Sequence, residues 1–133
     1  MGIDFLSVAD VLTIHRDQIE RYGGECGIRD LGLLESALAM PQAGAGGKRF
    51  HQDLFEMAGA YLFHIVKNHP FLDGNKRVGA MAAIVFLELN DVELAADEPG
   101  LEAVTLAVAE GSTGEISRIA GFFRRLAGAT HGD

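Results

Sequence analysis

The sequence has a single cysteine and few basic residues, and each shortage narrows what the protein can do. Cys26 has no partner within the chain, which excludes an internal disulfide and fits a reducing cytosol. Eleven Lys and Arg residues stand against 19 Asp and Glu, giving a net charge of −8. Non-specific nucleic-acid binding relies on a basic surface. We therefore expect no direct contact with nucleic acid.

Long apolar runs are also missing. No stretch reaches the ~18 apolar residues that a membrane span needs. The first residues, MGIDFLSVADVL, lack the basic region and apolar core of a signal peptide. We expect no membrane association and a cytoplasmic location. Without repeats or linkers, the 133 residues predict one domain over 1–133, with a flexible tail from about residue 128.

Apolar residues at helical spacing cover most of the sequence. Ser7 is placed to cap a helix that runs to about Arg21. Apolar spacing predicts further helices over about 30–40, 51–67, 75–89, 97–111 and 113–126, hence an all-α bundle of about six helices. The segment VGAMAAIVFLEL is apolar nearly all round and predicts a central helix. A short extended piece at 92–94 is expected to pair with residues 3–5, and the glycine-rich segment 41–50 is expected to be a mobile loop.

One polar stretch, HPFLDGNKRVG at residues 69–79, interrupts two apolar helices. Pro70 is expected to hold His69 in an extended conformation and so to end the helix before it. The first turn of the next helix offers free N–H groups and a partial positive charge, which attract phosphate. Lys76 and Arg77 lie in that turn, where cations are unfavourable unless an anion binds. Gly74 leaves room for the anion to approach the backbone.

Two further residues of this stretch have chemistry suited to a reaction. Asp73 is placed to hold Mg²⁺ beside phosphates, because Mg²⁺ takes few protein ligands and shares phosphate oxygens. His69 has the pKa range of a general base that takes a proton from a hydroxyl. Together these residues indicate transfer from a nucleoside triphosphate to a hydroxyl. The alternative from the residues alone is an ordinary turn and helix cap, with Phe71 buried beneath it.

The stretch HPFLDGNKR resembles the Fic motif, HPFx(D/E)GN(G/K)R, at every fixed position. The segments HRDQIERYGG, GIRDLGLLESAL and TGEIS resemble the Doc (death on curing) toxin branch of the Fic/Doc family. Together they span roughly residues 5–126. The resemblance implies an all-α fold whose central helical hairpin carries the motif.

The same resemblance implies roles for individual residues. His69 would be the general base and Asp73 the Mg²⁺ ligand. The segment 41–50 would be a flap that aligns the target beside the site. The triphosphate of ATP would be held by Gly74, Asn75, Lys76 and Arg77, with help from Lys67. For Lys67 the alternative is a solvated helix end, where a cation is favourable.

Lys76 bears on which group is transferred. By resemblance, Fic proteins with glycine at this place transfer AMP, whereas Doc proteins with lysine transfer the γ-phosphate. The resemblance thus implies a kinase acting on a protein hydroxyl, with elongation factor Tu as the candidate target and translation as the blocked process. Pro70 and Gly74 follow the general Fic pattern instead, so AMP transfer stays open. A non-catalytic nucleotide-binding module is a third alternative.

A partner protein is also implied. Many Fic proteins carry an inhibitory helix, (S/T)xxxE(G/N), but Glu110 and Gly111 are preceded by Leu106 where Ser or Thr is needed. We therefore expect a separate antitoxin. Elsewhere, His15 is expected either to line the cleft or to lie in the interior, and Arg124 and Arg125 are expected to be solvated.

Overall fold

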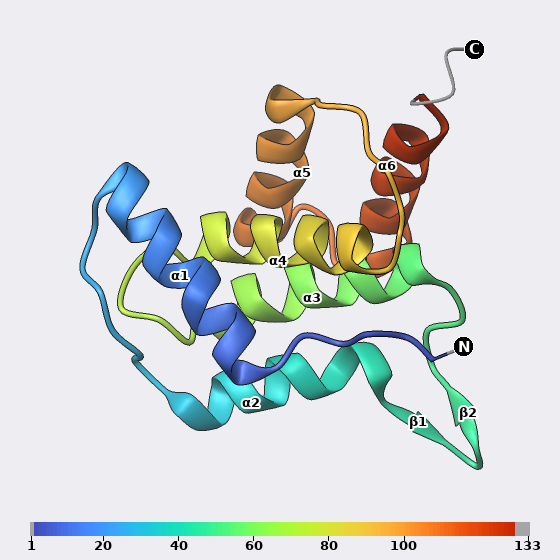
Figure 1. Cartoon of the computed structure of the whole chain (residues 1–133), viewed down its shortest axis with the longest axis horizontal. Coiled ribbons are helices and arrows are strands. Elements are labelled where there is room, and N and C mark those ends of the chain that lie inside the picture. Colours follow the sequence, from blue (N-terminus) through green and yellow to red (C-terminus); the bar gives the residue numbers. More distant parts are fainter. Residues whose placement is uncertain (1, 130–133) are drawn as a thin grey trace.

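Six α-helices and one small hairpin make up residues 2–129, the part of the chain that the computed structural model describes (Figure 1). None of these helices is long and apolar enough to cross a bilayer. The elements in chain order are α1 (Val8–Tyr22), α2 (Leu31–Ala39), the 3₁₀ turn η1 (Met40–Gln42), β1 (Gly44–Ala45), β2 (Lys48–Arg49), α3 (Leu54–Asn68), α4 (Asn75–Leu89), α5 (Glu98–Glu110) and α6 (Ile116–Ala129).

Polar side chains start most of the helices. Ser7 and Asp10 form a reciprocal capping box at α1, as a serine before an apolar periodic stretch predicts. Asp53 caps α3, so that helix begins at Leu54 and not at His51. The predicted start of the last helix was wrong, because the Ser112 N–H still bonds Ala107 O of α5 and α6 begins only at Ile116. The expected tail is helical to Ala129, and its remainder, 130–133, lies outside the described residues.

The antiparallel pair α3 and α4 is the centre of the fold, which confirms the predicted all-α class. α3 also packs against α2, α5 and α6. Two glycines permit this close approach. A Cβ on Gly79 of α4 would lie 2.8 Å from Val66 Cγ2 on α3, and one on Gly59 would lie 3.1 Å from the Ile116 carbonyl oxygen of α6. The core around them is almost entirely aliphatic and aromatic.

The N-terminal segment is held by a side chain and not by a strand. The predicted pairing of residues 3–5 with 92–94 was wrong, since neither segment forms a strand within residues 2–129. Instead the Asn90 amide binds both main-chain groups of Asp4: Oδ1 accepts from the N–H and Nδ2 donates to the carbonyl, each at 2.9 Å. One asparagine thereby replaces a short β-ladder.

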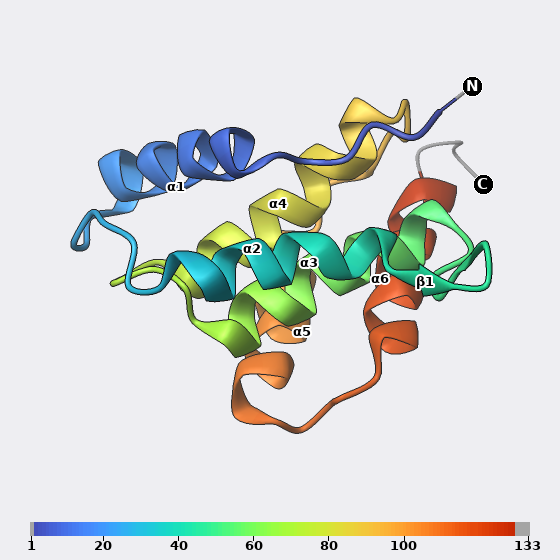
Figure 2. The same cartoon turned by 90° about the horizontal axis from the view of Figure 1, so that it is seen from below.

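The glycine-rich segment 41–50, expected to be a mobile loop, contains the β-hairpin formed by β1 and β2. Gly46 and Gly47 have φ of 61° and 80°, which suits a tight turn between β1 and β2. Figures 1 and 2 both place the hairpin at the N-terminal end of α3, whereas the loop with His69 lies at the other end. The expectation of a flap beside His69 is therefore wrong, because the 15-residue α3 separates the two by about 22 Å.

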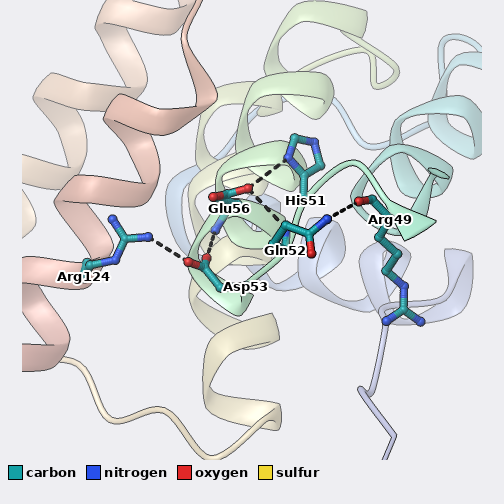
Figure 3. A network of polar contacts seen from close by, with 6 residues as sticks. All are labelled: Arg49, His51, Gln52, Asp53, Glu56 and Arg124. Carbon is teal, nitrogen blue, oxygen red and sulfur yellow. Dashed lines mark hydrogen bonds and ion pairs between the residues drawn. The ribbon is translucent and has the colours of Figure 1, made fainter. Parts of the chain in front are cut away.

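A polar network joins the hairpin and α6 to the start of α3 (Figure 3). Asp53 caps Glu56 N–H with one oxygen and binds Arg124 of α6 with the other at 2.9 Å. Glu56 in turn accepts from Gln52 N–H and lies 3.8 Å from His51 Nδ1. Arg124 was expected to be solvated and is instead paired, though both partners are about half exposed, so the pair stabilises the fold little.

Candidate active site

The loop between α3 and α4 borders a cleft of about 380 Å³ that gathers most of the predicted site residues. Lys67 is not among the residues that line it. That side chain is exposed in the last turn of α3, and its Nζ lies 4.0 Å from the position of a Cβ on Gly111, at the end of α5. The cleft is lined by Val66, His69, Leu72, Asp73, Gly74, Asn75, Lys76, Arg77 and Ala109.

His69 is the C-cap of α3 and has a left-handed backbone, with φ 51° and ψ 53°. The predicted extended conformation was wrong. Pro70 disfavours the right-handed helical region for His69, but in the left-handed conformation its N–H still donates to Ile65 O at 3.2 Å. The side chain is exposed at the cleft.

Asn75 holds the loop closed from inside. Its side chain is 4% exposed, and its amide accepts from Phe71 N–H at 2.9 Å and donates to Phe71 O at 3.0 Å. Phe71 itself is fully buried, as expected. The side-chain amide of Asn75 is thus engaged within the protein. Only the backbone N–H of this residue is left to bind an anion.

Asp73 presents an ionised carboxylate at the edge of the cleft. It accepts from Glu25 N–H at 3.3 Å and from its neighbour Gly74 N–H at 2.9 Å. These two bonds, with a smaller contribution from the Arg77 charge, hold the pKa of Asp73 below its usual value. A Cβ on Gly24 would lie 2.9 Å from Asp73 Oδ2, so a glycine is needed for this approach.

A single exposed carboxylate of this kind fits Mg²⁺, which commonly binds one or two carboxylates and takes its remaining ligands from water and phosphate. Residues 2–129 contain no group of three or more His, Cys, Asp or Glu side chains that could hold a metal ion alone. Any Mg²⁺ at Asp73 would therefore depend on the phosphates of a nucleotide for most of its ligands.

The start of α4 has the features of an anion site. Gly74 is its N-cap with φ 78°, and the N–H groups of the next three residues have no acceptor within the helix. Lys76 is exposed there. The Arg77 guanidinium donates to Gln18 O at 3.2 Å and Gly23 O at 3.0 Å, over the ring of Tyr22. Arg77 is thus held in place by the C-terminal end of α1.

His15 of α1 supports the loop from below. Its ring stacks on Phe71 with 4.0 Å between centroids, and its Nε2–H donates to Asp73 O at 3.0 Å. With 3% exposure and no place in the cleft lining, His15 is an interior residue, which decides between the two predicted alternatives.

The segment 23–30, between α1 and α2, makes contacts with the loop after α3 that sequence reasoning missed. Arg29 N–H and Asp30 N–H both donate to Pro70 O, and Leu72 N–H donates to Gly27 O. The Arg29 side chain reaches two carbonyls at the end of α3. The signal was present in GIRDLGLLESAL, which carried the family resemblance without any role for its arginine.

Comparisons with known proteins show which sequences this chain is similar to. Residues 5–87 match the sequence profile described as the Fic/DOC family. "Toxin Doc" of Mycolicibacterium smegmatis is 43% identical over 94 residues, which cover 71% of this chain and 70% of the relative. "Protein kinase doc" of Escherichia phage P1 is 34% identical over 124 residues, which cover 93% of this chain and 96% of the relative. The profile match contains both the loop with His69 and the segment 23–30.

Proposed function

The chain belongs to the Fic/DOC family, and from this premise we propose that it is the toxin of a toxin–antitoxin pair and transfers the γ-phosphate of ATP to a protein hydroxyl. The observation that carries the proposal is one cleft that brings His69, Asp73 and the first turn of α4 together. The names of the two relatives, a toxin and a protein kinase, support it.

In the proposed reaction, His69 takes the proton of the target hydroxyl as its oxygen attacks the γ-phosphorus. The bond between that phosphorus and the bridging oxygen breaks, and ADP leaves with the electron pair. The first-turn N–H groups of α4, Lys76 and Arg77 hold the phosphates and offset the charge that develops on them. Arg77 needs little reorganisation for this, since Gln18 and Gly23 already orient it.

Asp73 is the proposed ligand of Mg²⁺, because its low pKa keeps the carboxylate ionised across the physiological range. The bound ion would supply positive charge next to the phosphates. Lys76 favours transfer of the γ-phosphate over AMP, since a cationic side chain occupies space at the mouth of the cleft that glycine would leave open. By resemblance, elongation factor Tu is the proposed target and a separate protein is the proposed antitoxin.

Two forms of labelled ATP separate the alternatives. The folded chain is incubated with a bacterial lysate, Mg²⁺ and ATP labelled on either the γ- or the α-phosphate. We expect label on protein from the γ-phosphate alone, and mass spectrometry of the modified protein should show a phosphoryl gain. Transfer of the α-label would refute the kinase and support AMP transfer.

A matched histidine pair tests the base. His69→Ala should abolish transfer and toxicity while the protein stays folded, whereas His51→Ala, in the network at the far end of α3, should leave transfer intact. Full transfer by the His69 variant would refute the mechanism. ATP binding by the wild type without transfer of either label would favour the non-catalytic module.

A further inference from the structure

The backbone of His69 sets where its imidazole leaves the chain, because no polar partner holds the ring. Across residues 2–129, no hydrogen bond or ion pair reaches this side chain. Its direction into the cleft therefore depends on the left-handed φ and ψ of His69, a conformation that few residues other than glycine adopt. Within α3 this conformation is held by one hydrogen bond, from His69 N–H to Ile65 O, so contacts from outside the helix can add to its stability.

Arg29 makes contacts of this kind. Its Nε donates to His69 O at 2.6 Å and its Nη2 donates to Asn68 O at 2.9 Å. These two carbonyls belong to the last residue and the cap of α3, where carbonyls lack partners within the helix. A guanidinium is well matched to these two carbonyls for two reasons. It can donate two hydrogen bonds at once, and its positive charge is favourable at a helix C-terminus.

The main chain around Arg29 also bonds the residues that follow His69. Arg29 N–H donates to Pro70 O at 2.7 Å, and Ile28 forms an isolated antiparallel bridge with Phe71. On the other side, Asn68 Nδ2 donates to Leu33 O of α2 at 2.9 Å. The residues immediately before and after His69 are thus tied to the region that carries Arg29, and the Arg29 side chain closes the gap at His69 itself.

We propose that Arg29 is a positioning residue for the reaction: by bonding the Asn68 and His69 carbonyls, it holds the general base in the orientation that faces the substrate. This inference rests on the function proposed above. Arg29 is not among the residues that line the cleft, so its loss should lower kcat and leave the KM for ATP nearly unchanged. A misplacement of about 1 Å can lower a rate by roughly 100-fold.

The test compares Arg29→Met and Arg29→Lys with Arg118→Met. Arg118 is an exposed arginine of α6, and its side chain pairs with Glu115 on the surface. Arg29→Met should lower kcat about 10- to 100-fold, with the KM for ATP within about twofold of the wild type. Arg29→Lys, which keeps the charge but loses the fork, should recover part of the rate. Arg118→Met should change neither parameter.

A second readout does not depend on activity. The coupling between the amide and α protons of His69, measured by NMR, reports its φ, and it should change in Arg29→Met and stay unchanged in Arg118→Met. A kcat of Arg29→Met within twofold of the wild type, or an unaltered coupling, would overturn the proposal. If the wild type transfers nothing, the proposed function fails and the coupling alone decides whether Arg29 holds His69. If Arg29→Met does not fold, Arg29→Lys is judged by the same two criteria.

Discussion

Asn75 and Asn90 make the same kind of contact in different surroundings. Comparing them predicts how much the Asn75 contact, which closes the loop between α3 and α4, contributes to the free energy of unfolding. Each side-chain amide bonds the N–H and the carbonyl of one other residue: Asn75 bonds Phe71 in the interior, and Asn90 bonds Asp4 near the surface. Replacing Asn75 by alanine removes two hydrogen bonds. Replacing Asn90 removes three, because its Nδ2 also donates to Phe86 O at 2.8 Å, but that carbonyl keeps its bond from the Asn90 N–H. Only at Asn75 do buried main-chain groups lose their partner.

The magnitude follows from that difference. A buried polar group left without a partner costs about 1–3 kcal/mol, so Asn75→Ala should lower the free energy of unfolding by about 2–4 kcal/mol once some water enters from the adjoining cleft. For a chain of this length that corresponds to a melting temperature lower by about 10 °C. Asn90→Ala should cost about 1 kcal/mol, because water replaces the lost bonds at Asp4.

Urea unfolding followed by circular dichroism measures both variants. We expect parallel transitions of unchanged slope, with the Asn75 variant shifted to lower urea by at least twice as much as the Asn90 variant. Equal shifts would refute the reasoning that burial decides the cost. A shift below about 0.5 kcal/mol for Asn75→Ala would show that the loop does not need its internal amide.

Two further predictions concern the core. The Tyr61 hydroxyl accepts from Leu6 N–H at 2.9 Å, and burial raises the pKa of Tyr61 from 10.0 to about 12. The stability that the hydroxyl provides is therefore complete below pH 10 and is lost as the pH rises through about 12. Urea midpoints between pH 8 and 12 should fall less steeply with pH in Tyr61→Phe than in the wild type, and identical slopes would contradict this. Gly79→Ala should destabilise by about 1–2 kcal/mol through overpacking against Val66. A Cβ on Gly121 would have Arg125 Nη1 as its nearest atom, at 3.9 Å, so Gly121→Ala should stabilise by up to about 1 kcal/mol through helix propensity. Urea unfolding measures both glycine variants, and equal effects would contradict the packing argument.

The helices could be predicted because their signals are local. Ser7 caps α1 as predicted, and α5 is capped by Asp97 and Gly111, the two ends of the predicted range 97–111. The site could be predicted from the motif for the same reason, since its acidic and basic side chains lie within nine residues of sequence. That proximity in the chain placed His69, Asp73 and Arg77 in one cleft.

What could not be predicted depends on contacts between distant segments. The capture of Asp4 by Asn90, the pair of Arg124 with Asp53 and the grip of Arg29 on His69 each join residues at least 40 positions apart. No periodicity or local propensity reports such pairs. The conformation of His69 was missed because the rule for residues before proline excludes one region of backbone space and leaves two others.

The length of α3 sets a lower limit on the footprint of anything that contacts both of its ends. A molecule that contacted the hairpin tip and His69 together would have to bridge about 22 Å. In an extended polypeptide that distance takes about seven residues. The hairpin and the cleft can therefore bind one ligand together only if that ligand is a long peptide segment or a folded surface. Any smaller ligand would contact one end of α3 and not the other.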